Sequence, residues 1–257
     1  AGTTASLTLS GNITANTGGT ITVGGTNATR TASLSPVDID LNGTSSLVIG
    51  NTATSTSTVT ASGNVTIYGT LTVGSNANVT GHALNCSGTM TVNGTLQSGG
   101  NNTGNLHTIS ITNNLTTNGT VNFTSTTDQI ALNANANLTI NSGSNFTFNS
   151  TGNMSVAGVT QVGGTFTDGN VTGTDTFTGL VTVTGTGTWA TTTVTPENQM
   201  NFNGGVTNSG TFNAGGVQIG SGQTVTANTN MSIANGMDSN GGVIIAGAGE
   251  VSLNTAD

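Results

Sequence analysis

The sequence of 257 residues carries very little charge, and almost none of it is positive. Charged residues make up 4% of the chain, the formal net charge is −8, and Arg30 is the single residue of the Lys and Arg types. Proteins that bind nucleic acids or anionic lipid neutralise phosphates with Lys and Arg. The most apolar run, residues 242–246, is also far too short to cross a bilayer. We therefore expect no nucleic-acid partner and no membrane insertion.

Residues that usually carry catalysis or bind metals are equally scarce. Cys86 is the single Cys and cannot form an internal disulfide. His82 lies four residues before Cys86, but a structural zinc site normally needs four nitrogen or sulfur ligands. Asp38 and Asp40 are two positions apart and would point the same way from a strand. A calcium site, however, needs six to eight oxygen ligands. We therefore expect that the protein is not an enzyme and has no catalytic, cofactor-binding or metal site.

The abundant residues are small and polar: 56 Thr, 40 Gly, 35 Asn and 23 Ser. Disorder normally also needs a high net charge, which this chain lacks. Its apolar residues recur in pairs two positions apart, with Thr between them, which is typical of strands with one buried face. The sequence therefore predicts an all-β fold of short strands separated by Gly, Asn and Ser turns. The clearest pairs are Val65/Ile67, Leu71/Val73, Met90/Val92, Ile109/Ile111, Val121/Phe123, Leu138/Ile140, Phe146/Phe148, Val181/Val183, Met200/Phe202, Val217/Ile219 and Met231/Ile233.

A recurring segment, Gly-Thr followed by alternating apolar residues, indicates a repeat. When the longest intervals between copies are counted as two units each, the repeat period is about 20 residues, which suits one coil of a β-solenoid. Each coil would hold three short strands that each direct two apolar side chains inward. We predict an elongated, right-handed β-helix-like solenoid; the alternative is a β-sandwich or jelly roll. The copies are GTITV (19–23), GTLTV (69–73), GTMTV (88–92), GTLQS (94–98) and GTVNF (119–123), with weaker ones at 164–168, 187–191 and 210–214.

Three regions are expected along the chain. Residues 1–60 have longer gaps between apolar pairs and are predicted to be an irregular β segment. Residues 61–194 contain the densest pairs and form the predicted solenoid core. Pro is unwelcome inside a paired strand, so Pro196 suggests a break. Residues 195–257 then continue or cap the solenoid.

Asn-x-Ser/Thr occurs 17 times, which suggests a glycosylated surface protein. In many copies the middle residue is a large apolar one, and alternation along a strand generates that pattern unaided. Seven copies with a small, polar or Cys residue in the middle are cleaner candidates. These are Asn27, Asn42, Asn85, Asn93, Asn101, Asn118 and Asn149.

Thr alternates strictly over residues 172–178 and again over 182–188, which would place hydroxyls along one strand face. Such ladders resemble those of ice-binding β-solenoids. The runs do not recur in register from coil to coil in the sequence, so polar outer faces of ordinary strands are the preferred interpretation.

A β-rich chain with so little charge lacks the usual protection against pairing of strand edges, namely Lys, Pro and inward-pointing charges. Neighbouring subunits or glycans should therefore cover its surface. We expect the subunit of an extracellular filament, sheath or fibre that polymerises with itself through strand edges or coil stacking. The alternatives are an adhesin or virion tail-fibre module that binds glycans and, third, an ice-binding β-solenoid.

The segments GNVTIYGTLTVGSNANVTG (63–81) and SGTFNAGGVQIGSGQTVTANTNMSI (209–233) resemble the passenger β-solenoids of bacterial surface adhesins of the filamentous-haemagglutinin and autotransporter type. They also look like the β-rich stems of phage tail fibres and like archaeal sheath or filament proteins. This resemblance implies an elongated, non-enzymatic protein that is extracellular or on the cell surface, or else part of a virion.

Overall fold

The computed structural model describes residues 5–24, 31–50, 56–74, 81–99, 106–123, 129–169, 173–191, 200–239, 241 and 244–253. Within them the chain forms 33 β-strands and no helix. This part of the chain accordingly has no helix long and apolar enough to span a bilayer.

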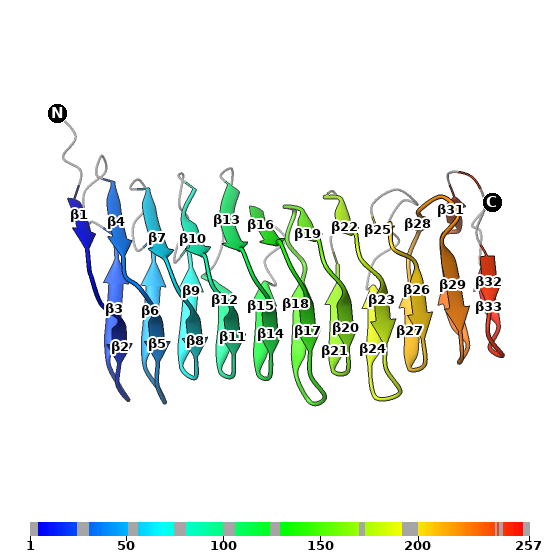
Figure 1. The fold of residues 1–257 in the computed structure, drawn as a ribbon, viewed down its shortest axis with the longest axis horizontal. Coiled ribbons are helices and arrows are strands. Elements are labelled where there is room, and N and C mark those ends of the chain that lie inside the picture. Colours follow the sequence, from blue (N-terminus) through cyan, green and yellow to red (C-terminus); the bar gives the residue numbers. More distant parts are fainter. Residues whose placement is uncertain are drawn as a thin grey trace.

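The strands form three parallel sheets that run side by side along a rod, with the two ends of the chain at opposite ends (Figure 1). Each sheet takes every third strand, so three successive strands make one coil, and each sheet has eleven strands. The predicted β-solenoid is therefore confirmed. A sandwich or jelly roll would need antiparallel pairs, whereas every pair here is parallel.

We call the three sheets A, B and C. Sheet A contains β1 (Ala5–Thr8), β4 (Ala32–Ser35), β7 (Ser57–Ala61), β10 (Ala83–Cys86), β13 (Leu106–Ile111), β16 (Gln129–Ala134), β19 (Met154–Val156), β22 (Asp175–Phe177), β25 (Met200–Phe202), β28 (Val217–Ile219) and β31 (Met237–Ser239). Sheet B contains β2 (Ile13–Ala15), β5 (Ile39–Leu41), β8 (Val65–Ile67), β11 (Met90–Val92), β14 (Leu115–Thr117), β17 (Leu138–Ile140), β20 (Thr160–Val162), β23 (Val181–Val183), β26 (Val206–Asn208), β29 (Thr224–Ala227) and β32 (Ile244–Ala246). Sheet C contains β3 (Thr20–Val23), β6 (Ser46–Ile49), β9 (Thr70–Val73), β12 (Thr95–Ser98), β15 (Thr120–Phe123), β18 (Asn145–Phe148), β21 (Thr165–Asp168), β24 (Thr188–Thr191), β27 (Thr211–Ala214), β30 (Met231–Ile233) and β33 (Val251–Leu253).

The apolar pairs found in the sequence are the inward-facing residues of these strands. In β8, Val65 and Ile67 are buried and Thr66 between them faces outward. The parallel register places Met90 and Val92 of β11 directly beside the two buried residues. Each inward position therefore forms a column along the rod, in which mainly apolar side chains stack from coil to coil.

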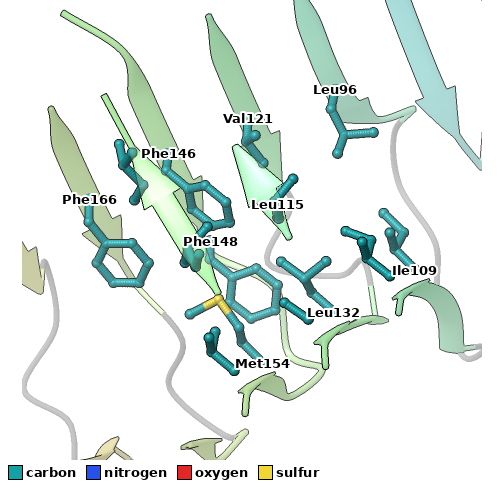
Figure 2. Close-up of a cluster of buried hydrophobic side chains, with 14 of the residues drawn as sticks. Leu96, Ile109, Leu115, Val121, Leu132, Phe146, Phe148, Met154 and Phe166 are labelled. Atoms are coloured by element: carbon teal, nitrogen blue, oxygen red, sulfur yellow. The ribbon is translucent and has the colours of Figure 1, made fainter. Parts of the chain in front are cut away.

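The core is a narrow strip enclosed by the three sheets, and Figure 2 shows part of it. Side chains such as Leu115 and Leu132 come from different sheets and point toward one another. Further along, aromatic residues fill the inward positions. Trp189 stacks on Phe166 with ring centroids 4.1 Å apart and on Phe212 at 5.8 Å. We call this run in sheet C, from Phe146 to Phe212, the aromatic column.

The Gly-Thr repeat marks the corner where the chain enters sheet C. Seven of its eight copies place Gly at this corner and Thr at the first outward position of the strand. The corner is tight: a Cβ on Gly94 would collide with the carbonyl oxygens of Tyr68 and Gly69 in the preceding coil. GTMTV is the exception, because its Met90 begins β11 in sheet B.

The connections from sheet C to sheet A absorb the differences in coil length. They range from residues 215–216 between β27 and β28 to residues 74–82 between β9 and β10. These connections separate the apolar pairs widely in residues 1–60, where the sequence predicts an irregular segment. The strands of that region nevertheless belong to the same three sheets, and β25 follows β22 in sheet A beyond Pro196. Pro196 itself lies outside the described residues.

Candidate functional site

The two His residues lie together inside the rod, at the start of sheet A strands in adjacent coils. Their rings stack with centroids 5.0 Å apart and planes 10° from parallel. Nδ1 of His82 accepts the Ser57 N–H at 3.0 Å, and Nδ1 of His107 accepts the His82 N–H at 2.9 Å. Nε2 of His107 is buried and has no hydrogen-bond partner. An Nδ1 that accepts a backbone N–H has to be unprotonated, so the ladder holds both rings neutral.

Burial explains the acid–base behaviour of this pair. Desolvation lowers the pKa of His82 to about 4. It lowers the pKa of His107 to about 4 as well, with a further contribution from the charge that His82 would carry. The sequence could not reveal this pairing, because the two residues are 25 positions apart and meet through the coil period.

Cys86 faces inward on β10 and lies apart from any metal-ligand set. Its thiol donates to the Gly63 carbonyl at 3.5 Å. Burial raises the pKa of the thiol, which disfavours the thiolate that would bind metal. No group of three or more His, Cys, Asp or Glu residues that could hold a metal occurs in the part of the chain that the structure describes.

Asp38 and Asp40 face outward around β5. Oδ1 of Asp38 accepts the backbone N–H of Asn64 in the next coil at 2.6 Å. Asn64 in turn accepts the Thr89 N–H at 2.9 Å. Asp38 therefore belongs to a chain of side-chain oxygens that joins successive coils at the corner between sheets A and B.

Two other carboxylates are buried, and the sequence did not lead us to expect them. Asp168 at the end of β21 and Asp175 at the start of β22 are 3% and 1% exposed. Oδ1 of Asp175 accepts the Met154 N–H at 2.6 Å. Each occupies an inward position that is apolar in the preceding coil, where Phe148 and Met154 lie. One residue separates each Asp from the nearest apolar residue in its strand. This alternation was the only sequence signal that the Asp side chain points inward.

The glycosylation candidates differ in exposure. Asn118 is exposed, and its amide nitrogen donates to Oδ1 of Asn93 at 2.8 Å. Asn42, Asn85, Asn93 and Asn149 are half-buried. The remaining candidates, at positions 27 and 101, lie outside the described residues. Whether any of the seven carries a glycan stays a prediction.

Thr residues recur in register in sheet B, although the two alternating runs noted in the sequence do not. The outward position of sheet B is Thr in eight of its eleven strands. The alternating runs noted in the sequence instead follow single coils around the rod: Thr182 lies on sheet B, whereas Thr188 begins β24 in sheet C. The register was hidden because coil lengths vary. The eight residues are Thr14, Thr66, Thr91, Thr116, Thr139, Thr182, Thr207 and Thr226.

The first described coil differs from the middle coils in its strand pairing. β1, β2 and β3 each pair with a strand on one side only among the described residues. Leu7 is 55% exposed, and Ile13 and Ile21 are partly exposed. A cavity of about 300 Å³, lined by residues that include Leu7, Ile21 and Leu34, opens at this end.

The last described coil differs from the middle coils in the same way. β31, β32 and β33 also pair on one side only within the described part of the chain. Ile244, Ile245 and Leu253 are 59%, 55% and 45% exposed, whereas inward residues in the middle coils are almost completely buried. The first and last described coils therefore have more exposed apolar side chains than the coils between them.

Comparison with protein-family models, with curated proteins and with solved structures finds no match.

Every strand pair among the described residues is parallel and follows chain order within its sheet. A strand at the edge of a parallel sheet presents backbone groups with which another parallel strand can pair. The rod geometry therefore allows coils to be added, whether they belong to the same chain or to another copy.

Proposed function

We propose that the protein is the structural subunit of an extracellular or cell-surface filament, sheath or fibre. The observation that carries this proposal is the rod of three parallel sheets, whose outward positions hold mainly uncharged polar residues and lack the charges that usually prevent strand pairing between molecules. A contact between different surfaces of identical subunits does not close on itself unless its rotation closes a ring, so it produces an open polymer.

The sides of the rod support the proposal as well. The outward positions hold mainly Thr, Ser, Asn and Gln, as in sheet A, where Asn85 of β10 lies beside Thr60 and Ser110. Large exposed apolar residues are sparse there, and Leu7, Ile244, Ile245 and Leu253, four of the eight, lie on the two terminal coils. The sides of the rod are therefore mainly polar and uncharged.

Electron microscopy and sedimentation of the purified protein at several concentrations test this function. We expect threads one rod wide, whose length increases with protein concentration. Dispersed monomers at every salt concentration, pH and protein concentration would overturn the proposal.

A charge on the last described coil provides the matched variant. Ile245→Lys puts an ammonium group on the terminal coil and should abolish threads, because the charge would be buried at the junction. Val159→Lys is the control: Val159 is 50% exposed on the side of the rod. It should form threads as the wild type does.

The Thr column on sheet B favours ice binding as a second candidate. Adjacent parallel strands lie about 4.8 Å apart, so the eight Thr residues lie in one outward column, which Asp40 and Gln161 interrupt. Thermal hysteresis of the wild type, reduced by Thr116→Lys, would support it, and the absence of hysteresis at millimolar protein would exclude it. The adhesin and virion-fibre functions stay predictions, since no feature of the described residues favours them.

A further inference from the structure

We propose that Asn42 and Asn203 are sites of spontaneous deamidation in the folded protein. Two other Asn residues that are also followed by Gly, Asn93 and Asn118, are protected by the hydrogen bonds of the rod. The inference goes beyond the proposed function, because it concerns a covalent modification at the corners of the coils and does not depend on whether the protein polymerises.

Deamidation of Asn is an intramolecular reaction that needs only water as a co-reactant. The backbone nitrogen of the following residue bonds to the side-chain carbonyl carbon Cγ. The bond between Cγ and Nδ2 breaks, and Nδ2 takes up the proton of the backbone N–H and leaves as ammonia. Water then opens the succinimide ring at either carbonyl and gives Asp or isoaspartate. Gly favours ring closure because it has no Cβ and its backbone is permissive.

The Gly N–H groups of the protected pair are fixed between coils. The Gly94 N–H donates to the carbonyl oxygen of Ile67 at 2.7 Å. The Gly119 N–H donates to the carbonyl oxygen of Val92 at 2.9 Å. Each nitrogen has to give up a hydrogen bond to the preceding coil before it can attack the neighbouring amide, which raises the barrier.

The side-chain amides of the protected pair are held as well. Nδ2 of Asn118 donates to Oδ1 of Asn93 at 2.8 Å. Nδ2 of Asn141 donates to Oδ1 of Asn118 at 2.5 Å. The three residues lie at successive corners between sheets B and C and form a ladder along the rod. Ring closure at Asn118 removes the Nδ2 that donates to Asn93, so the reaction also costs a bond of this ladder.

The reacting groups at Asn42 and Asn203 carry no such restraint. The N–H groups of Gly43 and Gly204 make no hydrogen bond to any part of the chain that the structure describes, and neither do the two Asn side chains. Asn42 begins a turn in which its carbonyl oxygen accepts the Ser45 N–H at 3.1 Å. Neither Gly nitrogen therefore has to break a bond between coils before it attacks.

Exposure divides the same residues differently. Asn118 and Asn203 are exposed, whereas Asn42 and Asn93 are half-buried. If access to water controlled the reaction, Asn118 and Asn203 would react first. Control by hydrogen bonds predicts Asn42 and Asn203 instead, so one experiment distinguishes the two causes.

Peptide mass spectrometry of the full chain, produced without glycans, tests the proposal. Folded protein and protein unfolded in guanidinium chloride are aged at neutral pH, digested with pepsin at low pH, and analysed for Asp and isoaspartate at each site. In the unfolded protein the four sites should react at similar rates, because Gly follows each of them. In the folded protein Asn42 and Asn203 should react about tenfold faster than the protected pair, the factor that corresponds to one hydrogen bond.

Several results would overturn the proposal. They are folded-state rates that follow exposure, equal rates at the four sites, and faster reaction at Asn93 and Asn118. Absence of reaction at Asn42 and Asn203 while the unfolded protein converts would overturn it too. The same order of rates in the unfolded protein would show that the local sequence, and not the fold, is the cause. None of these results depends on threads, so the filament function is tested separately.

Discussion

At the scale of single residues, the rod depends on positions where one side chain determines whether neighbouring coils can approach. Gly at the entrance to sheet C is such a position, because the carbonyl oxygens of the preceding coil occupy the space of a Cβ. The positions of the stacked His82 and His107 are another example. Nδ1 of each ring, in place of a backbone carbonyl oxygen, accepts a backbone N–H from the preceding coil.

Gly94→Ala should destabilise the fold by about 1–3 kcal/mol, since the added methyl group overlaps backbone atoms that cannot move without separating two coils. Urea unfolding measures this loss. Gly11→Ala is the control, since a Cβ there has no heavy atom within 4 Å. Equal stability of Gly94→Ala and Gly11→Ala would contradict the close-approach argument.

The His pair should make stability depend on pH. Both folded-state pKa values are about 4, below the value of about 6.5 in an unfolded chain. The unfolded state therefore takes up protons first, so this contribution is complete above pH 6.5 and is lost as pH falls from 6.5 to 4. Urea unfolding at a series of pH values measures the slope.

The matched variant for this test is His82→Asn combined with His107→Asn, because the Asn oxygen can accept the same backbone N–H without titrating. Its unfolding free energy should change less between pH 6.5 and 4, while the carboxylates contribute to both proteins alike. An unchanged slope would show that the two rings are not the cause.

At the scale of strands, the sequence predicts the inward and outward residues well. The pairs Val65/Ile67 and Phe146/Phe148 are buried as the two-residue period indicates. The alternation of apolar and polar residues depends only on neighbouring positions, so it can be recognised even in a chain built from few residue types. The assignment of strands to sheets is not local, which is why GTMTV (88–92) matches copies of the repeat that lie in a different sheet.

The aromatic column should be the most sensitive part of the core. Trp189→Ala removes a fully buried ring that packs on Phe166 and Phe212, and it should cost about 3–5 kcal/mol. Thermal unfolding with near-ultraviolet circular dichroism would follow it. Tyr68→Ala, at a position 57% exposed, should change stability by no more than about 0.5 kcal/mol. Comparable losses for the two variants would rule out this assignment of the core.

At the scale of the whole molecule, the sequence predicts a thin stacked rod, but not the features that depend on coil length. The Thr column on sheet B is invisible until the register is known, because successive coils differ in length at the connections from sheet C to sheet A. The pairing of His82 with His107 was hidden for the same reason. The burial of Asp168 and Asp175 instead follows from local alternation with Phe166 and Phe177 in their strands.

If copies join through their ends, stability should depend on protein concentration. Only the folded protein assembles, so the midpoint of thermal unfolding should rise as the protein concentration increases. Differential scanning calorimetry over a hundredfold concentration range measures this. The midpoint of Ile245→Lys should stay constant over the same range, and a constant midpoint for the wild type would argue against coupled assembly.

All strands of the rod point the same way within their sheets, so the molecule has a front and a back that are chemically different. A thread of such molecules would inherit that direction along its whole length. Its two tips would recruit subunits through unlike surfaces and elongate at unlike rates, and a blocking peptide with the sequence of β31 to β33 would arrest growth at one tip while the other continued.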